Sequence, residues 1–315
     1  MSGEPRTLHL TVRAEGGGTE RNVRLLCDRT PTFERLAMDE VMGFPLKWRK
    51  LGALRREIQK REPEVVFCYG AMAHLAMALM FPFGKPPMVG NIRGEIDFQG
   101  KKAWIQRAVA WRCATWVSNS RKALGNRAGT VIYNGVGLPG REKPLLKDLR
   151  KPVIGMLASG NPVKGHRWFL ELWTDLGKPG SLVFAGNLGE DLRREAFVAG
   201  VHCPGFVEAG PLLRSLDLLV VPSASEGMPT VLLEAMVREV PVMATPVGGI
   251  PELLEDGVTG VMRPREEWRE LLARPEWSAW RAMAKRGREK VERDFSFTAM
   301  QRGFLKVARE TVAGG

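Results

Sequence analysis

Residues 221–252, VPSASEGMPTVLLEAMVREVPVMATPVGGIPE, contain the pattern that decides the fold. They continue an apolar, β-branched run that begins at Leu216, and such a run predicts a strand covered on both faces of a parallel sheet. Residues 222–227 predict the loop that leaves the carboxyl end of this strand. Pro229 then predicts the first position of a helix, because a proline there loses no hydrogen bond. A strand, a loop and a helix in this order indicate an α/β domain.

Glu226 and Glu234 are the chemically distinctive residues of this stretch. Glu226 lies just before the predicted helix, and Glu234 lies inside it, about one turn further along and roughly 6 Å along the axis. The N–H groups that follow Pro229 carry partial positive charge, which makes the helix start an anion site. The two carboxylates can therefore contact two parts of one ligand. Taken alone, each glutamate also fits a solvated surface position.

Two segments, SEGMPTVLLEAM (225–236) and PVGGIPELLEDGVTGVM (246–262), resemble the donor-site signature of retaining nucleotide-sugar glycosyltransferases of family 4, which have the GT-B fold. Weaker similarity extends over most of the chain and includes VSNSRKA (117–123), VIYNGV (131–136) and NPVKGHRWFLE (161–171). The resemblance implies that Glu234 accepts hydrogen bonds from the ribose hydroxyls and that Glu226 contacts the transferred sugar. It also places four neighbours in the donor site, namely Gly227, Met228, Pro229 and Thr230.

The length of 315 residues exceeds the size at which one hydrophobic core usually keeps growing, so two domains are expected. Predicted strands alternate with predicted helices in both halves, which indicates parallel sheets wrapped by helices. A charged, proline-containing segment at residues 137–152 predicts the linker and gives domains at 1–149 and 150–315. The expected fold class is α/β. The resemblance implies a GT-B arrangement, with two doubly wound Rossmann-like domains facing a central cleft and the last helix crossing back to the first domain.

The net charge of +12 comes from the first half of the chain. Residues 1–150 contain 26 Lys and Arg against 14 Asp and Glu, whereas residues 151–315 contain 21 of each. This asymmetry indicates that one domain faces an acidic partner. Residues 44–64 predict a basic amphipathic helix, and residues 98–116 interleave tryptophans with Lys and Arg, a combination that anionic lipid headgroups favour. We therefore expect docking on an anionic membrane surface, and a lipid-linked, lipopolysaccharide or polysaccharide acceptor.

The location and the metal content are also predicted by what the chain lacks. No apolar run approaches the roughly 20 residues that a membrane-spanning helix needs, and the N-terminus has no signal-peptide core. The expected location is the cytoplasm, peripherally at the cytoplasmic face of the inner membrane. The four cysteines and four histidines show no metal-ligand spacing, and no D-x-D motif occurs. Transfer is therefore expected to need neither a metal nor a cofactor.

A nucleotide-sugar donor leaves negative charge on the departing diphosphate, so its site needs fixed positive groups. Lys164, between a predicted strand and a predicted helix, is expected to be catalytic, as Glu226 is, with an exposed lysine at a helix start as the alternative. Gly17 and Gly18 follow the first strand and let N–H groups approach a phosphate closely, with a plain flexible turn as the alternative. Ser159 stands where the family usually has an arginine, so a second cation has to come from elsewhere.

Arg93 and Glu20 are expected on the acceptor side. Arg93 follows a first-domain strand, at a position where the family often has histidine. It faces the acceptor, supplies the missing charge, or is an ordinary surface arginine. Glu20 belongs to a stretch that resembles the first loop of the family.

Two further pairs of residues are expected in the donor site. Gly248 and Gly249 form a predicted turn before a helix, and its N–H groups can hold the sugar hydroxyls or the distal phosphate. Phe206 and Val207 resemble the segment that receives the nucleobase. The alternative for this second pair is two core residues at the end of a strand.

Other classes of function fit parts of the sequence. A sugar-nucleotide epimerase or a phosphorylase with the GT-B fold is compatible with much of the motif set. A basic nucleic-acid-binding protein would explain the charge and the tryptophans. However, no helix-turn-helix, zinc or RNA-binding motif accompanies the charge, and the neutral second half would be unexplained, so no nucleic-acid partner is expected.

Overall fold

The computed structural model describes residues 3–14, 18–93 and 100–314, with the backbone alone for residues 100–103 and 106. The chain divides into two compact units, of which the first contains Met1–Asn134 and Phe297–Gly315, and the second contains Gly135–Ser296. Each unit has one six-stranded sheet with helices around it. All strand pairs are parallel, so the α/β prediction is confirmed.

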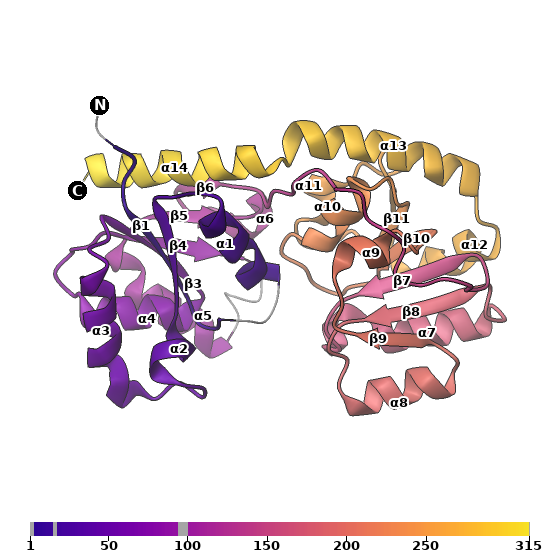
Figure 1. The fold of residues 1–315 in the computed structure, drawn as a ribbon, viewed down its shortest axis with the longest axis horizontal. Coiled ribbons are helices and arrows are strands. Elements are labelled where there is room, and N and C mark those ends of the chain that lie inside the picture. Colours follow the sequence, from indigo (N-terminus) through magenta and orange to yellow (C-terminus); the bar gives the residue numbers. More distant parts are fainter. Residues whose placement is uncertain (1–2, 15–17, 94–99, 315) are drawn as a thin grey trace. The chain divides into compact units, whose positions relative to one another are not determined.

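The sheet of the first unit has the strand order β2-β1-β3-β4-β5-β6 (Figure 1). Its central strands β1, β3 and β4 are buried along their whole length, which explains why their sequences are apolar runs rather than alternating patterns. The strands are β1 (Thr7–Thr11), β2 (Phe33–Ala37), β3 (Val65–Tyr69), β4 (Met88–Ile92), β5 (Cys113–Ser118) and β6 (Gly129–Val131).

Helices cover both faces of this sheet. On one face, Leu10, Met38 and Ile58 belong to a core that α2, α3 and α4 share with the strands. On the other face, Phe67 and Phe304 belong to a core that includes α1 and α14. The helices of this unit are α1 (Gly18–Asp28), α2 (Met38–Met42), α3 (Leu51–Lys60), α4 (Ala71–Met80), α5 (Gly100–Val109), α6 (Arg121–Leu124) and α14 (Phe297–Ala313), with 3₁₀ turns η1 (Trp48–Lys50) and η3 (Ala110–Arg112).

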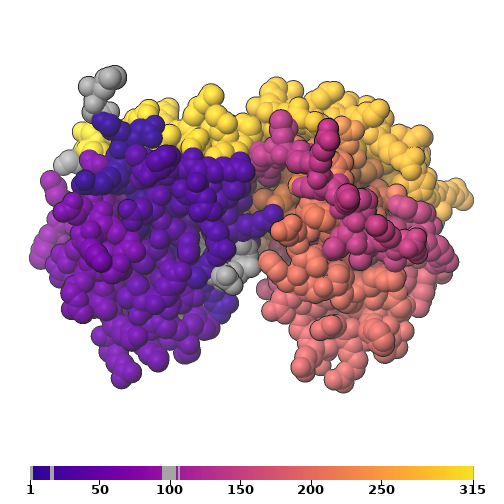
Figure 2. Space-filling view, in the orientation of Figure 1, coloured from indigo at the N-terminus to yellow at the C-terminus, as the bar shows by residue number. Residues whose placement is uncertain are grey.

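The last helix, α14, lies on the first unit, although the sequence between Gly135 and Ser296 separates it from the rest of that unit. Figure 2 shows it in yellow against the indigo N-terminal segment, and an ion pair of 3.3 Å joins Arg309 to Glu4 there. Gln301 also donates a hydrogen bond of 3.0 Å to the carbonyl of Arg29. The resemblance implies such a return of the last helix to the first domain.

The sheet of the second unit has the strand order β12-β11-β10-β7-β8-β9. Its strands are β7 (Val153–Leu157), β8 (Ser181–Ala185), β9 (His202–Gly205), β10 (Leu218–Val221), β11 (Val242–Ala244) and β12 (Val261–Met262). Its helices are α7 (His166–Asp175), α8 (Glu190–Val198), α9 (Ala209–Leu213), α10 (Thr230–Met236), α11 (Ile250–Leu253), α12 (Trp268–Ala273) and α13 (Trp277–Asp294), with 3₁₀ turns η4 (Pro162–Lys164) and η5 (Arg265–Glu267).

The division between the units lies 15 residues before the predicted boundary at 149/150. The segment expected to be an exposed linker is held on the second unit by specific contacts. Leu145 N donates to Pro211 O at 2.9 Å, and Leu146 N donates to Ser215 Oγ at 2.9 Å. Arg238 forms a mostly buried ion pair of 2.6 Å with Glu142. The prolines and charges of this segment therefore belong to an ordered strap along the second unit.

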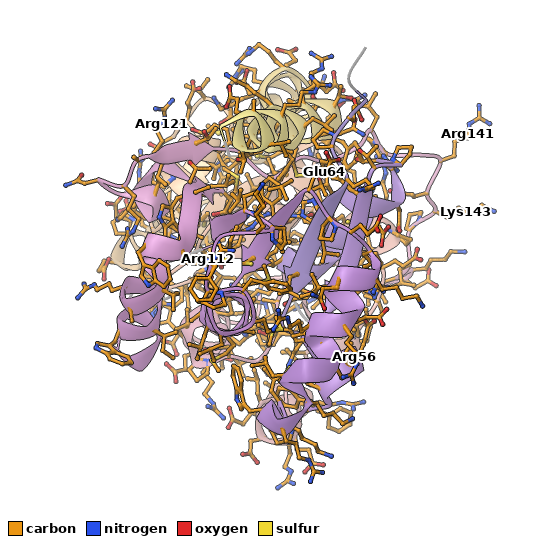
Figure 3. The ribbon with its side chains drawn as sticks, turned by 90° about the vertical axis from the view of Figure 1, so that its left-hand side faces the viewer. Arg56, Glu64, Arg112, Arg121, Arg141 and Lys143 are labelled. Atoms are coloured by element: carbon orange, nitrogen blue, oxygen red, sulfur yellow. The ribbon has the colours of Figure 1, made fainter. Side chains whose placement is uncertain are left out.

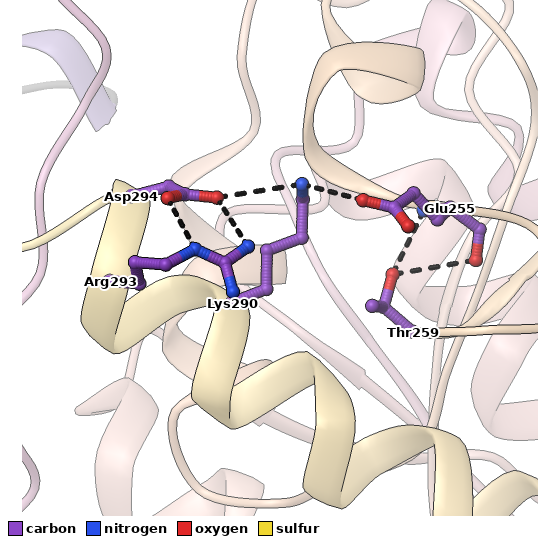
Figure 4. Close-up of polar contacts among 5 residues, drawn as sticks. All are labelled: Glu255, Thr259, Lys290, Arg293 and Asp294. Carbon is purple, nitrogen blue, oxygen red and sulfur yellow. Dashed lines mark hydrogen bonds and ion pairs between the residues drawn. The ribbon is translucent and has the colours of Figure 1, made fainter.

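The long helix α13 is fastened to the turn that follows α11. Lys290 contacts Glu255 at 2.8 Å and Asp294 at 3.6 Å, and Arg293 contacts Asp294 at 2.8 Å (Figure 4). Thr259 closes the turn by a hydrogen bond of 2.9 Å to the main-chain N–H of Glu255. The hydrogen bond from Lys290 lowers the pKa of Glu255, so the carboxylate stays charged at neutral pH. These contacts hold the turn that follows α11 against α13, and they thereby support α11 and the glycine turn before it.

The charge asymmetry follows the structural division closely. The first unit contains 25 Lys and Arg against 13 Asp and Glu, a net charge of +12. The second contains 22 of each and is neutral. Among the helices that the structure describes, none has both the length and the apolar character needed to cross a bilayer.

Candidate functional site

The carboxyl edge of the sheet in the second unit gathers most of the residues that the sequence singles out. Because the strands are parallel, the loops that follow β7, β10 and β11 all leave at this edge. Ala224 N, in the loop after β10, donates to Val163 O, in the loop after β7, at 2.8 Å. Loops far apart in the sequence thus form one continuous surface.

Lys164 and Glu226 form an ion pair in this surface. The distance between Lys164 Nζ and Glu226 Oε1 is 2.7 Å, and Ser223 Oγ donates to the same oxygen at 2.6 Å. The side chain of Glu226 is only 8% exposed, whereas that of Lys164 is 27% exposed. A buried carboxylate with two donors is fixed in orientation, and its ammonium partner reaches towards solvent. The two predicted catalytic residues are therefore in direct contact.

The Lys164 turn is built from residues with specific backbone conformations. Asn161 Oδ1 accepts a hydrogen bond from Val163 N, and Pro162 begins the 3₁₀ turn η4 that ends at Lys164. Gly165 follows with φ +80°, a left-handed conformation that favours glycine. α7 then begins at His166.

Arg265 braces this turn. Its Nε donates to Pro222 O at 2.9 Å, and its guanidinium lies over the ring of Trp168, 4.9 Å from the centroid. A Cβ on Gly165 would come within 2.5 Å of Arg265 Nη2 and of Pro222 O. Arg265 therefore joins the end of β10 to the start of α7. The sequence offers no signal for this role, because Arg265 lies about a hundred residues from the turn it holds.

The Gly248–Gly249 turn lies directly on the loop of Glu226. Gly249 N donates to Gly227 O at 2.6 Å, and a Cβ on Gly248 would overlap the carbonyl group of Glu226. Gly248 also has φ +57°. Only glycine satisfies both requirements at this position. The predicted turn is thus present, and its closeness to Glu226 is a feature that spacing alone could not reveal.

Ser223 and Thr245 complete the connection between β10 and β11. Thr245 Oγ1 donates to Ser223 O at 2.5 Å, and both side chains are buried. The hydrogen bond therefore fixes the main chain next to the hydroxyl that holds Glu226. Neither residue is singled out by the sequence, since buried Ser and Thr at strand ends are common.

The start of α10 differs from the expectation that Pro229 is the first residue of the helix. Pro229 has an extended backbone, with φ −70° and ψ 110°, and it is the N-cap residue, so the helix begins at Thr230. The helix has seven residues and ends at Met236. Glu234 lies half-buried on it, and its carbonyl accepts a hydrogen bond of 2.9 Å from Arg238. Met228 is buried beside the loop.

His166 lies next to Lys164 but is a buried neutral group. Burial, with a smaller contribution from the Lys164 charge, lowers its pKa to about 4. Its ring contacts Phe184 edge-on, and among the residues that the structure describes neither ring nitrogen has a hydrogen-bond partner. We therefore assign His166 a packing role.

Ser159 and Phe206 are both exposed near this edge. Phe206 follows β9 and is 84% exposed, so its interpretation as a core residue is wrong. Val207 is half-buried. Gly186 N donates to Gly205 O at 2.8 Å, which fixes the main chain just before the aromatic ring. An exposed ring on a fixed strand end is suited to stack against a planar group.

The predicted residues of the first unit lie at the ends of β1 and β4. Gly17 falls outside the described residues, Gly18 begins α1, and Glu20 lies in the first turn of that helix. Arg93 follows β4, donates to Asn134 Oδ1 at 2.6 Å and lies over the ring of Tyr69 at 5.3 Å. Arg93 is half-buried and held by these partners, so the interpretation as an ordinary surface arginine is wrong.

The described residues contain no group of three or more His, Cys, Asp or Glu side chains that could hold a metal ion. At the carboxyl edge, the Glu226 carboxylate is engaged by Lys164 and Ser223. The edge thus offers a fixed carboxylate and a partly exposed ammonium.

The second unit is similar in sequence to a known protein family. Residues 151–274 match the model of the family Glycosyl transferases group 1. The putative colanic acid biosynthesis glycosyltransferase WcaL of Salmonella typhimurium is 35% identical over 117 residues, covering 32% of this chain and 29% of that protein. A D-inositol 3-phosphate glycosyltransferase of Segniliparus rotundus is 31% identical over 191 residues, covering 53% of this chain and 42% of that protein. The chain thus spans less than half of these curated relatives.

Solved structures show the fold of the whole chain. Anabaena HepE in complex with UDP-glucose has a TM-score of 0.77 at 17% identity, covering 98% of this chain and 99% of that one. Sucrose-phosphate synthase from Thermosynechococcus elongatus has a TM-score of 0.80 at 16% identity, with the same coverage. The predicted GT-B fold class is confirmed by these similarities.

Proposed function

We propose that the protein is a retaining, metal-independent glycosyltransferase that moves a sugar from a nucleotide-diphosphate sugar to a lipid-linked, lipopolysaccharide or polysaccharide-type acceptor. The observation that carries the proposal is the contact of Lys164, Glu226 and Ser223 at the carboxyl edge of the second unit. The family match covers this edge, and the relatives named above are glycosyltransferases.

The ion pair suggests how the site prepares for a donor. In the free protein, Glu226 neutralises Lys164 at 2.7 Å. A donor diphosphate would compete for the same ammonium, and Glu226 would then be available to accept hydrogen bonds from the transferred sugar. Lys164 would stabilise the negative charge that develops on the leaving diphosphate, which is the largest electrostatic demand of the reaction. Ser223 keeps the carboxylate in place during this exchange.

The remaining donor contacts follow the signature. Glu234 would accept hydrogen bonds from the ribose hydroxyls, and the exposed ring of Phe206 would lie beside the base. In the glycine turn, Gly249 N already donates to Gly227 O, so the N–H of Gly248 would be the one presented to the sugar hydroxyls or the distal phosphate. Anabaena HepE, which has a similar fold, forms complexes with UDP and with UDP-glucose, so a UDP-sugar is the first donor to test.

Retention of configuration needs no dedicated protein base, because the leaving phosphate can accept the proton of the acceptor hydroxyl on the same face. Ser159 cannot neutralise a phosphate, and Arg265 is engaged with Pro222. The second cation therefore has to come from another group. On the acceptor side we propose Arg93, whose guanidinium is held by Asn134 and Tyr69 and needs little further ordering on binding.

The acceptor and the location are proposed from the first unit and from the relatives. A net charge of +12 on this unit favours association with an anionic membrane at the cytoplasmic face of the inner membrane. The name of WcaL points to polysaccharide biosynthesis. A lipid-linked glycan would combine both features in one substrate.

The proposal is tested by incubating the protein with candidate sugar nucleotides, with and without a bacterial lipid-linked glycan fraction. Transfer predicts nucleoside diphosphate release that requires the acceptor and that EDTA does not abolish, and a product with the anomeric configuration of the donor by NMR. Nucleotide release or sugar isomerisation without an acceptor would instead identify an epimerase. Sugar release by inorganic phosphate would identify a phosphorylase.

A further inference from the structure

Four large apolar side chains are exposed on two helices of the first unit that contact each other, α4 and α5, and on the segments that follow these helices. Phe83 is 98% exposed, Trp104 is 70% exposed and Trp111 is 69% exposed, and Leu79 is exposed on the last turn of α4. Phe83 lies in the loop between α4 and β4, whereas the tryptophans lie on α5 and η3. A cluster of this kind marks a surface that binds something, since single exposed apolar residues are common but gathered ones are not.

Arg112 holds the two parts of this cluster together. Its Nε donates to Phe81 O at 2.7 Å, and its Nη2 donates to Pro86 O at 2.9 Å. These carbonyls lie at the two ends of the loop that presents Phe83, and Arg112 itself follows Trp111 directly in the chain. Arg112 is buried within the unit, whereas Arg56 on α3 is exposed; Figure 3 labels both residues. The loop is therefore fixed beside Trp111.

The outward face of α5 continues the cluster. Trp104 and Arg107 stand at positions i and i+3 of α5, a spacing that places them on one side of the helix, and Trp111 follows in the 3₁₀ turn η3. All three are exposed. Exposed indole rings near a cation suit the headgroup level of a bilayer, where the rings enter the apolar boundary and the guanidinium contacts phosphates.

The charge around the cluster selects an anionic partner. Residues 65–135 contain nine Lys and Arg but only two acidic residues, Glu95 and Asp97, and both of these lie outside the described part of the chain. Lys85 is exposed in the same loop as Phe83, and Arg107 lies between the tryptophans. Apolar insertion and electrostatic attraction therefore favour the same occupant, an anionic lipid surface.

We propose that the loop of Phe83 and the face formed by Trp104 and Trp111 insert into the interface of an anionic bilayer, with Arg112 as the brace that presents them together. This inference rests on the membrane docking in the proposed function and deepens it. It assigns the inserted residues, whereas the proposed docking by net charge needs only surface attraction.

Vesicle co-sedimentation tests the insertion. The full-length protein is mixed with vesicles of equal parts phosphatidylglycerol and phosphatidylcholine, and binding is measured at physiological salt and at high salt. The double variant Phe83→Ser with Trp111→Ser should bind about tenfold more weakly, because each lost side chain removes part of an apolar burial. The wild type should keep measurable binding at high salt, where attraction between surface charges is screened, and the variant should lose it.

A matched control comes from the second unit. Phe197 is exposed on α8, in the unit without net charge, so Phe197→Ser should bind vesicles as the wild type does. Acyl chains brominated near the headgroup should quench part of the tryptophan fluorescence of the wild type. This quenching should be lost in Trp104→Phe with Trp111→Phe, which keeps the apolar surface.

Equal vesicle binding by the double serine variant and the wild type, together with no quenching, would overturn the inference. A loss of self-association in that variant, with vesicle binding unchanged, would assign the surface to a second copy of the chain and would also overturn it. Binding of UDP to the same preparations is measured in parallel. If the wild type binds vesicles as expected but no sugar nucleotide, the glycosyltransferase proposal fails while the insertion stands.

Discussion

The two units are built on the same six-stranded parallel sheet, but they place different chemistry at their surfaces. In the second unit, the loops after β7, β10 and β11 contact one another through glycines, hydrogen bonds and one ion pair, and the unit carries no net charge. The first unit carries the whole net charge of +12 and exposes large apolar residues on and after α4 and α5. Under our proposals, the same architecture serves as a small-ligand site in the second unit and as a surface for an anionic partner in the first.

The rigidity of the second unit is tested most severely at Gly248. A Cβ there would overlap the carbonyl of Glu226 and force alanine into φ +57°, so Gly248→Ala should lower the free energy of unfolding by about 2–5 kcal/mol and abolish transfer. Thermal unfolding and a transfer assay measure both effects.

Gly257 is the matched control for this change. It has φ +70° in the same unit, but nothing lies within 4 Å of the position that a Cβ would take. Gly257→Ala should cost only the backbone strain, about 1–2 kcal/mol, and should leave transfer intact. Equal losses of stability and of transfer activity in the two variants would show that the close contact between Gly248 and the Glu226 carbonyl group does not affect the site.

Lys164 tests whether the ion pair at the carboxyl edge is functional. Lys164→Ala should lower turnover by about 10² to 10³ fold, because it removes a charge that stabilises the leaving group. Lys151 offers a control with the same type of pair, since it contacts Asp217 at 2.9 Å just before β7 and thus at the other edge of the sheet. If Lys151→Ala and Lys164→Ala had equal turnover, the two edges would not differ in function.

Arg265 tests whether the brace positions Lys164 rather than touching the substrate. Arg265→Ala should lower kcat by about tenfold and leave KM for the donor nearly unchanged, because the lost interaction holds the Lys164 turn through Pro222. Arg265→Lys should restore part of the rate. Arg269→Ala removes an exposed partner of Asp175 and serves as the control. A large rise in KM with unchanged kcat would assign Arg265 to binding instead.

Buried histidines distinguish the units by their response to acid. Burial lowers the pKa of His9 to about 3 and that of His74 to about 4 in the first unit, and that of His166 to about 4 in the second. Their contribution to stability is complete above pH 6.5, where the unfolded histidines are also neutral. It is lost as the pH falls towards the folded pKa values, because the unfolded chain then binds more protons.

The first unit, with two such histidines, should therefore lose more stability than the second between about pH 6.5 and 5.5, above the range in which the carboxylates of the unfolded chain bind protons. Each histidine contributes a slope of at most about 1.4 kcal/mol per pH unit. Hydrogen exchange measured separately on peptides from each unit detects the difference. Equal slopes in the two units would contradict the burial of His9 and His74 as the cause.

The sequence predicted those parts of the fold whose residues are buried on both faces. The runs at Val65–Tyr69 and Leu218–Val221 are apolar because helices cover both sides of the sheet. Three edge strands lack such a run. β2 contains charged residues, β9 contains a proline, and β12 has only two residues. Edge strands avoid continuous apolar runs, so their pattern is weak.

The sequence pointed to residues that the structure places at one edge of the sheet, but not to the contacts among them. The resemblance to a signature drew attention to Glu226, Glu234 and the glycine turn, and their roles in binding stay predictions. The pairing of Lys164 with Glu226 joins residues 62 positions apart, and the hydrogen bond of Arg265 to Pro222 spans 43 positions. Such contacts arise from the stacking of parallel strands, which the spacing of residues does not encode.

The central claim, that the carboxyl edge of the second unit binds a nucleotide-diphosphate sugar, is tested most directly by thermal unfolding with UDP, GDP, ADP and CMP. One nucleotide should raise the Tm of the wild type, since a ligand at a hundred times its Kd stabilises the folded state by about 2.7 kcal/mol. The same nucleotide should have little effect on Glu234→Ala and Lys164→Ala. An unchanged Tm of the wild type with all four nucleotides, or an equal shift in both variants, would contradict the claim.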